Sequence, residues 1–225
     1  MFTDIIKQYS HIEQRINDTQ LLLDPWPHMY ITEVFTPDFY RTVQGFETLE
    51  PLNYHHEYGR KEYTFNQYSP EFEQFTSKIF KLLANKFSDF LGPKPTQDVP
   101  ATSNFWVDNS DLEIQDIHTD LFFDTPIAIS GQIYLPDDLT QKHLGTELYR
   151  YAGDDLEAET HQDEGLPYPH AVIDPDNNNF EMVRRVPFYP NGMMVTINTP
   201  DSWHRAPTIL PEDGERRSLM LRWKV

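Results

Sequence analysis

The hydrophobic positions of the first hundred residues recur at the spacing of amphipathic helices. The clearest case is the segment SPEFEQFTSKIFKLLANKFSDFLGP, residues 69–93. It begins with Ser69 as a helix cap and Pro70 at the first helical position, and Gly92-Pro93 ends it. The hydrophobic stripe of this predicted helix consists of Phe72, Phe75, Ile79, Leu82, Leu83 and Phe90. One face of the helix is therefore expected to pack against a core.

Shorter elements precede that helix. Residues 2–16 space their isoleucines loosely at helical period, and residues 28–35, HMYITEVF, alternate like a short strand. Residues 36–49 predict a further helix, because Thr36 can cap it and Pro37 suits its first position. Residues 1–100 are therefore interpreted as a mainly helical support region with an early strand.

The pattern changes after a Pro-rich connector at residues 92–100. From residue 101 onward, short strand candidates alternate with turns, as in a sandwich or small barrel. The candidates are TSNFWV, LEIQDIHTD, PIAISGQIYL, GTELYRY, FEMVRRV, GMMVTI and RRSLMLRWKV. The helical stripes can only be buried against this sheet. We therefore expect a mainly β fold with added helices (α+β), as a single domain over residues 1–225 with its β-core at 101–225.

Composition and charge narrow the possible functions. Hydrophobic residues make up 38% of the 225-residue chain, which is enough for a real core. The formal charge of −18 argues against a protein that binds nucleic acid through charge. The absence of cysteine excludes disulfides, thiolate metal sites and cysteine nucleophiles. The N-terminal stretch carries charges throughout, so neither a signal peptide nor a membrane span is expected, and a cytoplasmic location is predicted.

The stretch DIHTDLFFD, residues 116–124, contains the first candidate ligands. His118 and Asp120 are two residues apart in a strand-like run, so their side chains would share one face. A second histidine, His204, follows much later, next to Trp203. Two histidines and one carboxylate form a set that holds Fe(II) and leaves adjacent positions open, which suits oxygen activation with a chelating cosubstrate. We expect His118, Asp120 and His204 to bind one metal ion.

A basic pair lies downstream of His204. A chelating 2-oxoacid needs a guanidinium group for its distal carboxylate. Arg216 and Ser218 are again two residues apart on a predicted strand and could grip that group together. Since Arg217 must then point the other way, Arg216 is assigned to the pocket.

These elements, in this order, resemble the Fe(II)- and 2-oxoglutarate-dependent oxygenases, in particular the prolyl-4-hydroxylase-like branch. GQIYLPDD followed by GTELYRY is similar to the family's strand ending in Tyr-Leu and its later Thr-Glu-Leu strand. VPFYPNGMMVTINT resembles the stretch before the second histidine, and DPWPHMYITEVFTPDFY resembles the family's N-terminal segment. The likeness covers roughly residues 24–46 and nearly all of 101–225.

The resemblance implies a double-stranded β-helix of the jelly-roll or cupin type. It implies Fe(II), 2-oxoglutarate and O2 as cofactor and cosubstrates, and a Tyr134 hydroxyl that joins Arg216 at the distal carboxylate. The implied reaction couples conversion of 2-oxoglutarate to succinate and CO2 with hydroxylation of a C–H bond. Collagen-type enzymes carry lysine at the position of Arg216, which weakens the inference that this chain shares their substrate. Retention of Asp120 points to hydroxylation rather than halogenation.

Alternatives remain open at this stage. A zinc-type hydrolase could use the same His/Asp/His set, and a non-catalytic β-barrel binding module could retain the motif. The substrate is expected to be a prolyl or other amino-acid side chain, a peptide or a small molecule, with no nucleic acid and no membrane as partner. Trp106 and Trp203 fit either a pocket mouth or core packing, the acidic segment 153–164 fits either an exposed loop or a lid, and His55-His56 is interpreted as part of a loop.

Overall fold

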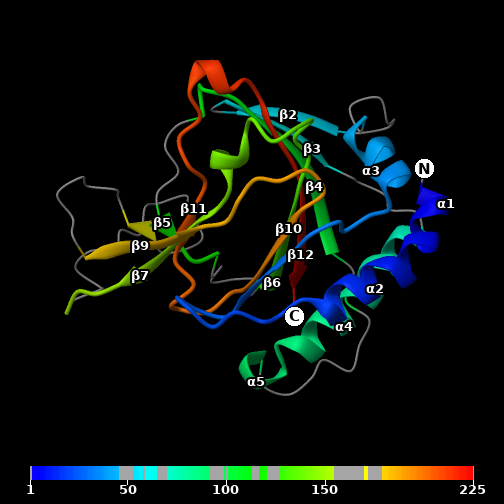
Figure 1. Ribbon diagram of the computed structural model, residues 1–225, viewed down its shortest axis with the longest axis horizontal. Coiled ribbons are helices and arrows are strands. Elements are labelled where there is room, and N and C mark those ends of the chain that lie inside the picture. Colours follow the sequence, from blue (N-terminus) through cyan, green and yellow to red (C-terminus); the bar gives the residue numbers. More distant parts are fainter. Residues whose placement is uncertain are drawn as a thin grey trace.

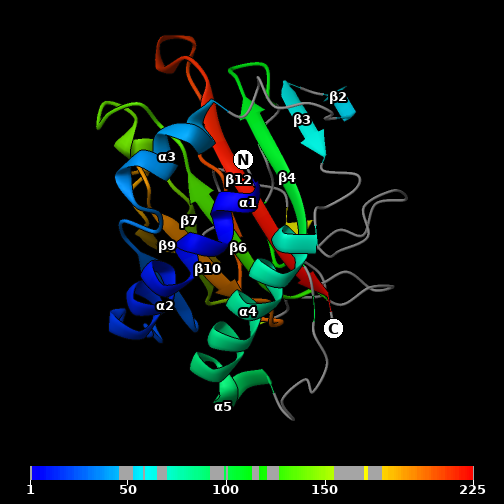
Figure 2. The same ribbon diagram turned by 90° about the vertical axis from the view of Figure 1, so that its right-hand side faces the viewer.

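Two antiparallel sheets and a layer of helices form the part of the chain that the computed structural model describes (Figure 1). The described residues are 2–45, 53–57, 59–64, 70–91, 99, 101–112, 117–120, 127–154, 170–171 and 179–224. The larger sheet has the strand order β1-β10-β6-β12-β4-β3-β2, and the smaller has the order β8-β5-β11-β7-β9. The helices cover the face of the larger sheet that is turned away from the smaller sheet (Figures 1 and 2).

The larger sheet is built from strands of both halves of the chain. Its strands are β1 (His28–Ile31), β2 (Asn53–Glu57), β3 (Arg60–Thr64), β4 (Ala101–Asp108), β6 (Ile127–Tyr134), β10 (Met193–Ile197) and β12 (Arg216–Lys224). The smaller sheet contains β5 (Ile117–His118), β7 (Glu147–Tyr151), β8 (His170–Ala171), β9 (Phe180–Arg185) and β11 (His204–Arg205). The helices are α1 (Phe2–Ile5), α2 (Tyr9–Asp18), α3 (Pro37–Gln44), α4 (Pro70–Lys86) and α5 (Ser88–Leu91).

Strand β12 shows why the larger sheet has one apolar and one polar face. Successive side chains of a strand point to opposite faces. Leu219, Leu221 and Trp223 belong to the hydrophobic core under the helices. Arg216 and Arg222 point the other way, into a cavity between the sheets. The apolar face therefore holds the helices in place, while the polar face is left for chemistry.

Helix α4 packs on the apolar face as its sequence pattern predicts. Phe72, Phe75, Ile79 and Leu83 are buried there. The Phe80 ring stacks on Trp223, whose indole N–H donates a 3.0 Å hydrogen bond to the Thr76 carbonyl. Phe90 does not join the stripe and is 42% exposed, because the helix ends at Lys86 and a separate short helix continues in another phase. The packing of the helices against the sheet is confirmed.

Several predicted elements differ from the structure. The loop interpretation of His55-His56 is wrong, because both residues lie in β2, which pairs with β3 and extends the larger sheet. Of the strand expected at residues 112–120, the structure shows the two residues of β5, which ends before Thr119 and Asp120; residues 113–116 lie outside the described residues. Ser69, residues 92–98 and residues 155–164 of the acidic segment lie outside the described residues. None of the helices described is long and apolar enough to cross a membrane.

Candidate metal centre

The two candidate histidines meet because their strands pair with each other. In the smaller sheet, β5 and β11 are antiparallel and place His118 directly opposite His204. Directly opposed residues bring their side chains close together on one face of the sheet. The two imidazole ring centroids are 4.7 Å apart. A pair separated by most of the β-core in sequence is thus brought to one point.

Asp120 completes the cluster, but not because it shares a strand face with His118, as the sequence spacing suggested. β5 ends at His118, and Asp120 has a φ of 53°, the left-handed conformation that aspartate tolerates better than most residues. The turn brings one carboxylate oxygen 3.7 Å from Nε2 of His118 and the other 3.6 Å from Nε2 of His204. The three potential ligand atoms lie within 4.8 Å of one another, as coordination of one ion requires.

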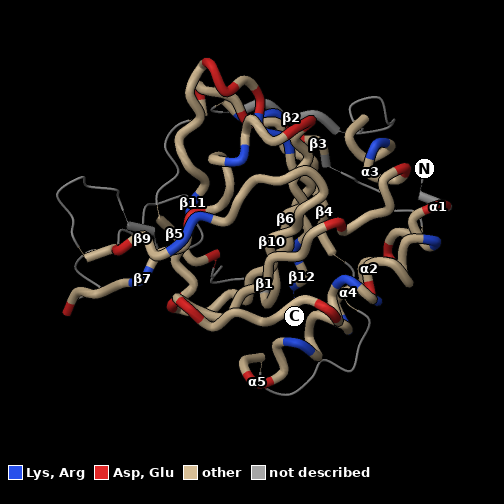
Figure 3. The backbone as a smooth tube through the Cα atoms, in the orientation of Figure 1, with Lys and Arg blue, Asp and Glu red and all other residues tan. Residues whose placement is uncertain are grey.

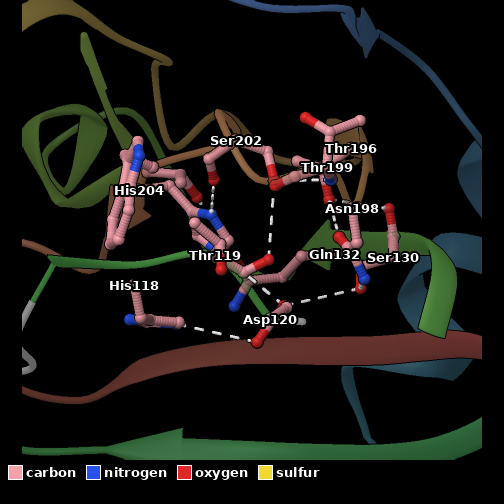
Figure 4. A network of polar contacts seen from close by, with 12 residues as sticks. His118, Thr119, Asp120, Ser130, Gln132, Thr196, Asn198, Thr199, Ser202 and His204 are labelled. Carbon is pink, nitrogen blue, oxygen red and sulfur yellow. Dashed lines mark hydrogen bonds and ion pairs between the residues drawn. The ribbon is translucent and has the colours of Figure 1, made fainter. Parts of the chain in front are cut away.

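His204 is held in the orientation and tautomer that a metal ligand needs. Its Nδ1 lies 2.8 Å from the Ser202 carbonyl, so Nδ1–H donates there and Nε2 is the ring nitrogen that faces Asp120, where a metal ion would take the place of a proton (Figure 4). The Ser202 hydroxyl lies 2.8 Å from the Thr199 carbonyl and 3.4 Å from the Thr119 carbonyl, which brings the turn before β11 next to the segment that carries Asp120. Trp26 packs beside the ring at 6.1 Å between centroids.

A second layer of polar side chains supports Asp120. The Ser130 hydroxyl of β6 donates to the Asp120 carboxylate at 3.5 Å, and the Asn198 amide donates to Ser130 at 3.3 Å (Figure 4). These residues come from the polar face of the larger sheet and from the end of β10. The carboxylate is therefore positioned by both sheets.

The electrostatics of the cluster keep its carboxylate ionised. Burial alone would raise the pKa of Asp120, but the hydrogen bond and charge of His204, together with His118 and Arg222, lower it below its usual range. Burial acts to lower the pKa of His204, but Asp120 and the Ser202 carbonyl outweigh it and raise that pKa. A charged carboxylate between two imidazoles is a donor set for a divalent transition metal.

The cluster opens into a cavity of about 130 Å³ between the two sheets. Residues of both sheets and of the segment after β11 line it: Arg60, Trp106, His118, Asp120, Gln132, Thr146, His204, Arg205, Ala206, Arg216, Met220 and Arg222. Arg216 is 1% exposed, whereas Arg217 is only half-buried and pairs with Glu215. Arg216 is thus the member of the pair that lines the cavity.

Arg216 is fixed on three sides. Its Nε donates to the Leu144 carbonyl at 2.8 Å, and Nη1 donates to the Asp108 carboxylate at 3.1 Å. Nη2 lies 3.4 Å from the side-chain oxygen of Gln132. Asp108 is itself fully buried and also accepts a bidentate ion pair from Arg60. The guanidinium group is thus held in one orientation before any ligand arrives.

The other two candidate residues for the cosubstrate lie just behind the cavity wall. Ser218 and Tyr134 are both fully buried and do not line the cavity. Ser218 accepts a 3.0 Å hydrogen bond from the Gln132 amide. The Tyr134 hydroxyl lies 2.7 Å from the Thr146 hydroxyl, and either can be the donor. Each is therefore hydrogen-bonded to a residue that lines the cavity, Gln132 or Thr146.

Sequence reasoning missed several residues of this site. Asp108 and Gln132 position Arg216, and Thr146 connects the cavity to Tyr134. The alternation Asn104, Trp106, Asp108 in β4 was a signal, because it places polar and aromatic groups on one face of an otherwise apolar strand. Of the two tryptophans considered for the pocket, Trp106 lines the cavity, while Trp203 is packed in a small core.

Comparisons with known proteins find relatives by structure and not by sequence. No protein-family model matches the chain, and no curated protein matches it. A prolyl-4-hydroxylase from Pseudomonas putida superposes with a TM-score of 0.53 at 14% identity, covering 95% of this chain and 98% of its own.

Two further solved structures have a similar fold. HygX from Streptomyces hygroscopicus, with nickel, 2-oxoglutarate and hygromycin B bound, has a TM-score of 0.53 at 11% identity, covering 88% of this chain and 82% of its own. The non-heme α-ketoglutarate-dependent carbocyclase SnoK from nogalamycin biosynthesis has a TM-score of 0.51 at 12% identity, covering 95% and 83%. The expected fold is confirmed: the chain has the double-stranded β-helix fold of the 2-oxoglutarate-dependent oxygenases.

Proposed function

We propose that the chain is an Fe(II)- and 2-oxoglutarate-dependent oxygenase whose metal is held by His118, Asp120 and His204. The observation that carries the proposal is the meeting of these three side chains at one end of a cavity whose other wall presents the buried Arg216. Neither the His/Asp/His cluster nor the arginine is specific for this function by itself, since such clusters are common and arginines often line pockets. Together they match both ends of a chelating dicarboxylate.

The donor set fits a redox-active divalent metal. Two imidazole nitrogens and one carboxylate bind Fe(II) and leave several positions open, and the chain contains no thiolate that oxygen chemistry would damage. When bound, the metal supplies the activation of O2 that accompanies conversion of 2-oxoglutarate to succinate and CO2. The protein positions the reactants and keeps bulk water from the buried end of the cavity.

Arg216 is the proposed anchor for the distal carboxylate of 2-oxoglutarate. A guanidinium fork binds a carboxylate through paired charge-assisted hydrogen bonds. We assign Ser218 and Tyr134 a supporting role, because Gln132 and Thr146 link them to the cavity surface. Tyr134 would act indirectly, since its hydroxyl is hydrogen-bonded to the Thr146 hydroxyl and Thr146 lines the cavity.

The proposed reaction is hydroxylation of an unactivated C–H bond. The substrate is a prolyl or other amino-acid side chain, a peptide or a small molecule. Two observations on the structural relatives support this range: one is a prolyl-4-hydroxylase, and another was solved with hygromycin B bound.

The test is succinate formation by the protein with Fe(II), 2-oxoglutarate and O2, measured without added substrate as uncoupled turnover. H204A is expected to abolish succinate formation and to lose Mn(II) binding by calorimetry. The matched control is H143A, which removes a half-exposed histidine that pairs with Asp213 outside the cavity. Full turnover by H204A, or equal loss in both variants, would refute the metal assignment.

The same preparation separates the two rival functions. A zinc-type hydrolase would have no use for Arg216 and would be active with Zn²⁺ in the absence of 2-oxoglutarate and O2. A non-catalytic binding module would bind neither Fe(II) nor 2-oxoglutarate. Binding of both, followed by O2-dependent succinate release, excludes each alternative.

A further inference from the structure

The wall of the cavity carries more positive charge than its acidic neighbours balance. Four guanidinium groups line it, those of Arg60, Arg205, Arg216 and Arg222. This contrasts with a formal charge of −18 for the whole chain. In Figure 3, acidic and basic positions are both scattered over the outer helices and turns, and one group of basic positions lies on β11 and the adjoining part of β9. The cavity is therefore a locally basic site in an acidic chain.

Two buried carboxylates account for most of these guanidinium groups. Asp108 binds both Arg60 and Arg216. Glu147 accepts hydrogen bonds from Arg205, at 2.5 Å, and from Arg185 of β9. Both carboxylates are almost fully buried, so their ion pairs are screened little by water. These arginines already have partners.

Arg222 forms no such pair among the described residues, although its charge is near enough to Asp120 to help lower the pKa of that carboxyl. Its Nε is buried without a hydrogen-bond partner, and its guanidinium group forms no ion pair within the part of the chain that the structure describes. It lies over the ring of Trp106 at 4.8 Å from the centroid, and the Trp106 indole is fixed by a 2.9 Å hydrogen bond to Glu62. Arg222 is half-buried, so its charge is partly hydrated, but its buried Nε lacks a hydrogen-bond partner that an anionic ligand would supply.

Binding of metal and cosubstrate does not remove the excess. Among the described residues, the cavity and the residues bound to its wall contain five guanidinium groups and four carboxylates, with Asp120 and the Glu62 that accepts from Trp106 included. That leaves one positive charge in excess. A divalent cation and the 2-oxoglutarate dianion cancel each other, so the ternary complex keeps the same excess.

We propose, resting on the function proposed above, that the primary substrate carries an oxyanion, a carboxylate or a phosphate, which Arg222 binds beside Trp106 at the metal end of the cavity. The anion would orient the substrate so that the carbon to be oxidised faces His118, Asp120 and His204. Arg222 is then the residue that selects charged over neutral substrates, while Arg216 serves the cosubstrate. The two arginines are on the same face of β12, six positions apart in the sequence.

The test measures binding of matched probes by calorimetry to protein loaded anaerobically with Mn(II) and 2-oxoglutarate. One panel pairs free L-amino acids with their C-terminal amides, and the other pairs nucleoside 5′-monophosphates with the parent nucleosides. At least one anion is expected to bind tenfold more tightly than its neutral partner, and the responding panel identifies carboxylate or phosphate. R222Q should lose that preference at least tenfold, and R222K should retain part of it.

Two controls separate this proposal from the proposed function. R217Q removes the neighbouring arginine that points away from the cavity and should leave every affinity unchanged. R222Q should bind 2-oxoglutarate within twofold of the parent protein. The inference is overturned if no anion in either panel is preferred, or if R222Q weakens 2-oxoglutarate binding, which would assign Arg222 to the cosubstrate. Failure of the parent protein to bind Mn(II) and 2-oxoglutarate would instead refute the oxygenase, and the same panels without them would still test the charge preference.

Discussion

Replacing Asp108 with asparagine removes one negative charge from behind Arg216 and leaves the shape of the side chain almost unchanged. Asp108 is fully buried, and one of its oxygens accepts a 2.6 Å hydrogen bond from Nε of Arg60. The other oxygen accepts from Nη1 of Arg216 at 3.1 Å and from Nη2 of Arg60 at 3.2 Å. An asparagine offers only one acceptor oxygen. One guanidinium group must therefore face an amide NH2 in the D108N variant.

The expected cost follows from the burial of the partners. Removing one member of a buried ion pair typically costs about 3–5 kcal/mol, because it leaves the other charge uncompensated. Arg216 is 1% exposed and cannot turn to water, whereas the Arg60 side chain is 19% exposed and can recover some hydration. We therefore expect the lower end, a loss of about 3 kcal/mol. For a chain of this size that corresponds to a fall of about 6–12 °C in Tm.

Thermal and urea unfolding of D108N and the parent protein provide the assay. The matched control is D111N, which changes an exposed aspartate in the turn just after β4 and should cost less than about 0.5 kcal/mol. The effect should persist in high salt, because the pair is buried. If D108N unfolds at the same temperature as D111N, the reasoning about Asp108 as the counterion of Arg216 is wrong.

Three further predictions concern other parts of the molecule. R216K keeps the charge and loses the fork, so the Kd for 2-oxoglutarate measured by calorimetry should rise about tenfold; an unchanged Kd would contradict the proposed anchor. Glu147 is almost fully buried, and although burial would raise its pKa, hydrogen bonds from Tyr149 and two arginines lower it. The stability that it contributes is therefore present above its unfolded pKa and is lost as the pH falls through its folded pKa. E147Q should be less stable than the parent protein at pH 7, and urea unfolding should show this difference narrowing below about pH 4; a constant difference would disprove the link. Mn(II) at a hundred times its Kd should stabilise the protein by about 2.7 kcal/mol. A Tm shift in the parent protein and none in H204A would verify this, and equal shifts in both would place the metal elsewhere.

The layered fold could be predicted because it depends on local patterns. The alternation in β12 and the stripe of α4 each specify an apolar face, and the two faces meet in the structure. Phe90 was assigned to that stripe in error, since the sequence does not show the change of phase after Lys86. Boundaries of this kind depend on tertiary packing rather than on the spacing of hydrophobic residues.

The reason for pairing His118 with Asp120 in the sequence differs from the geometry that brings them together in the structure. His118 and Asp120 were paired because alternate residues of a strand share a face, yet the strand ends at His118 and the turn at Asp120 brings the carboxylate into place. Asp108 and Glu147 escaped detection for a different reason. Each acquires its role from strand pairing: β4 pairs with β12, and β7 pairs with β11. The register between two distant strands cannot be predicted from the sequence of either strand alone.

The site is divided between two sheets of unequal rigidity, and this division explains which residues must be held by other means. Arg216 begins the nine-residue strand β12, which is paired on both sides by β4 and β6. His118 and His204 instead lie in strands of two residues, where the backbone ladder can fix little. The ligands are therefore secured by side chains: the Ser202 carbonyl holds one imidazole, and Ser130 reaches across from the larger sheet to Asp120. Under the proposed function a chelating cosubstrate would span the metal and Arg216, so its fit would depend on the packing between the sheets as much as on the ligands themselves.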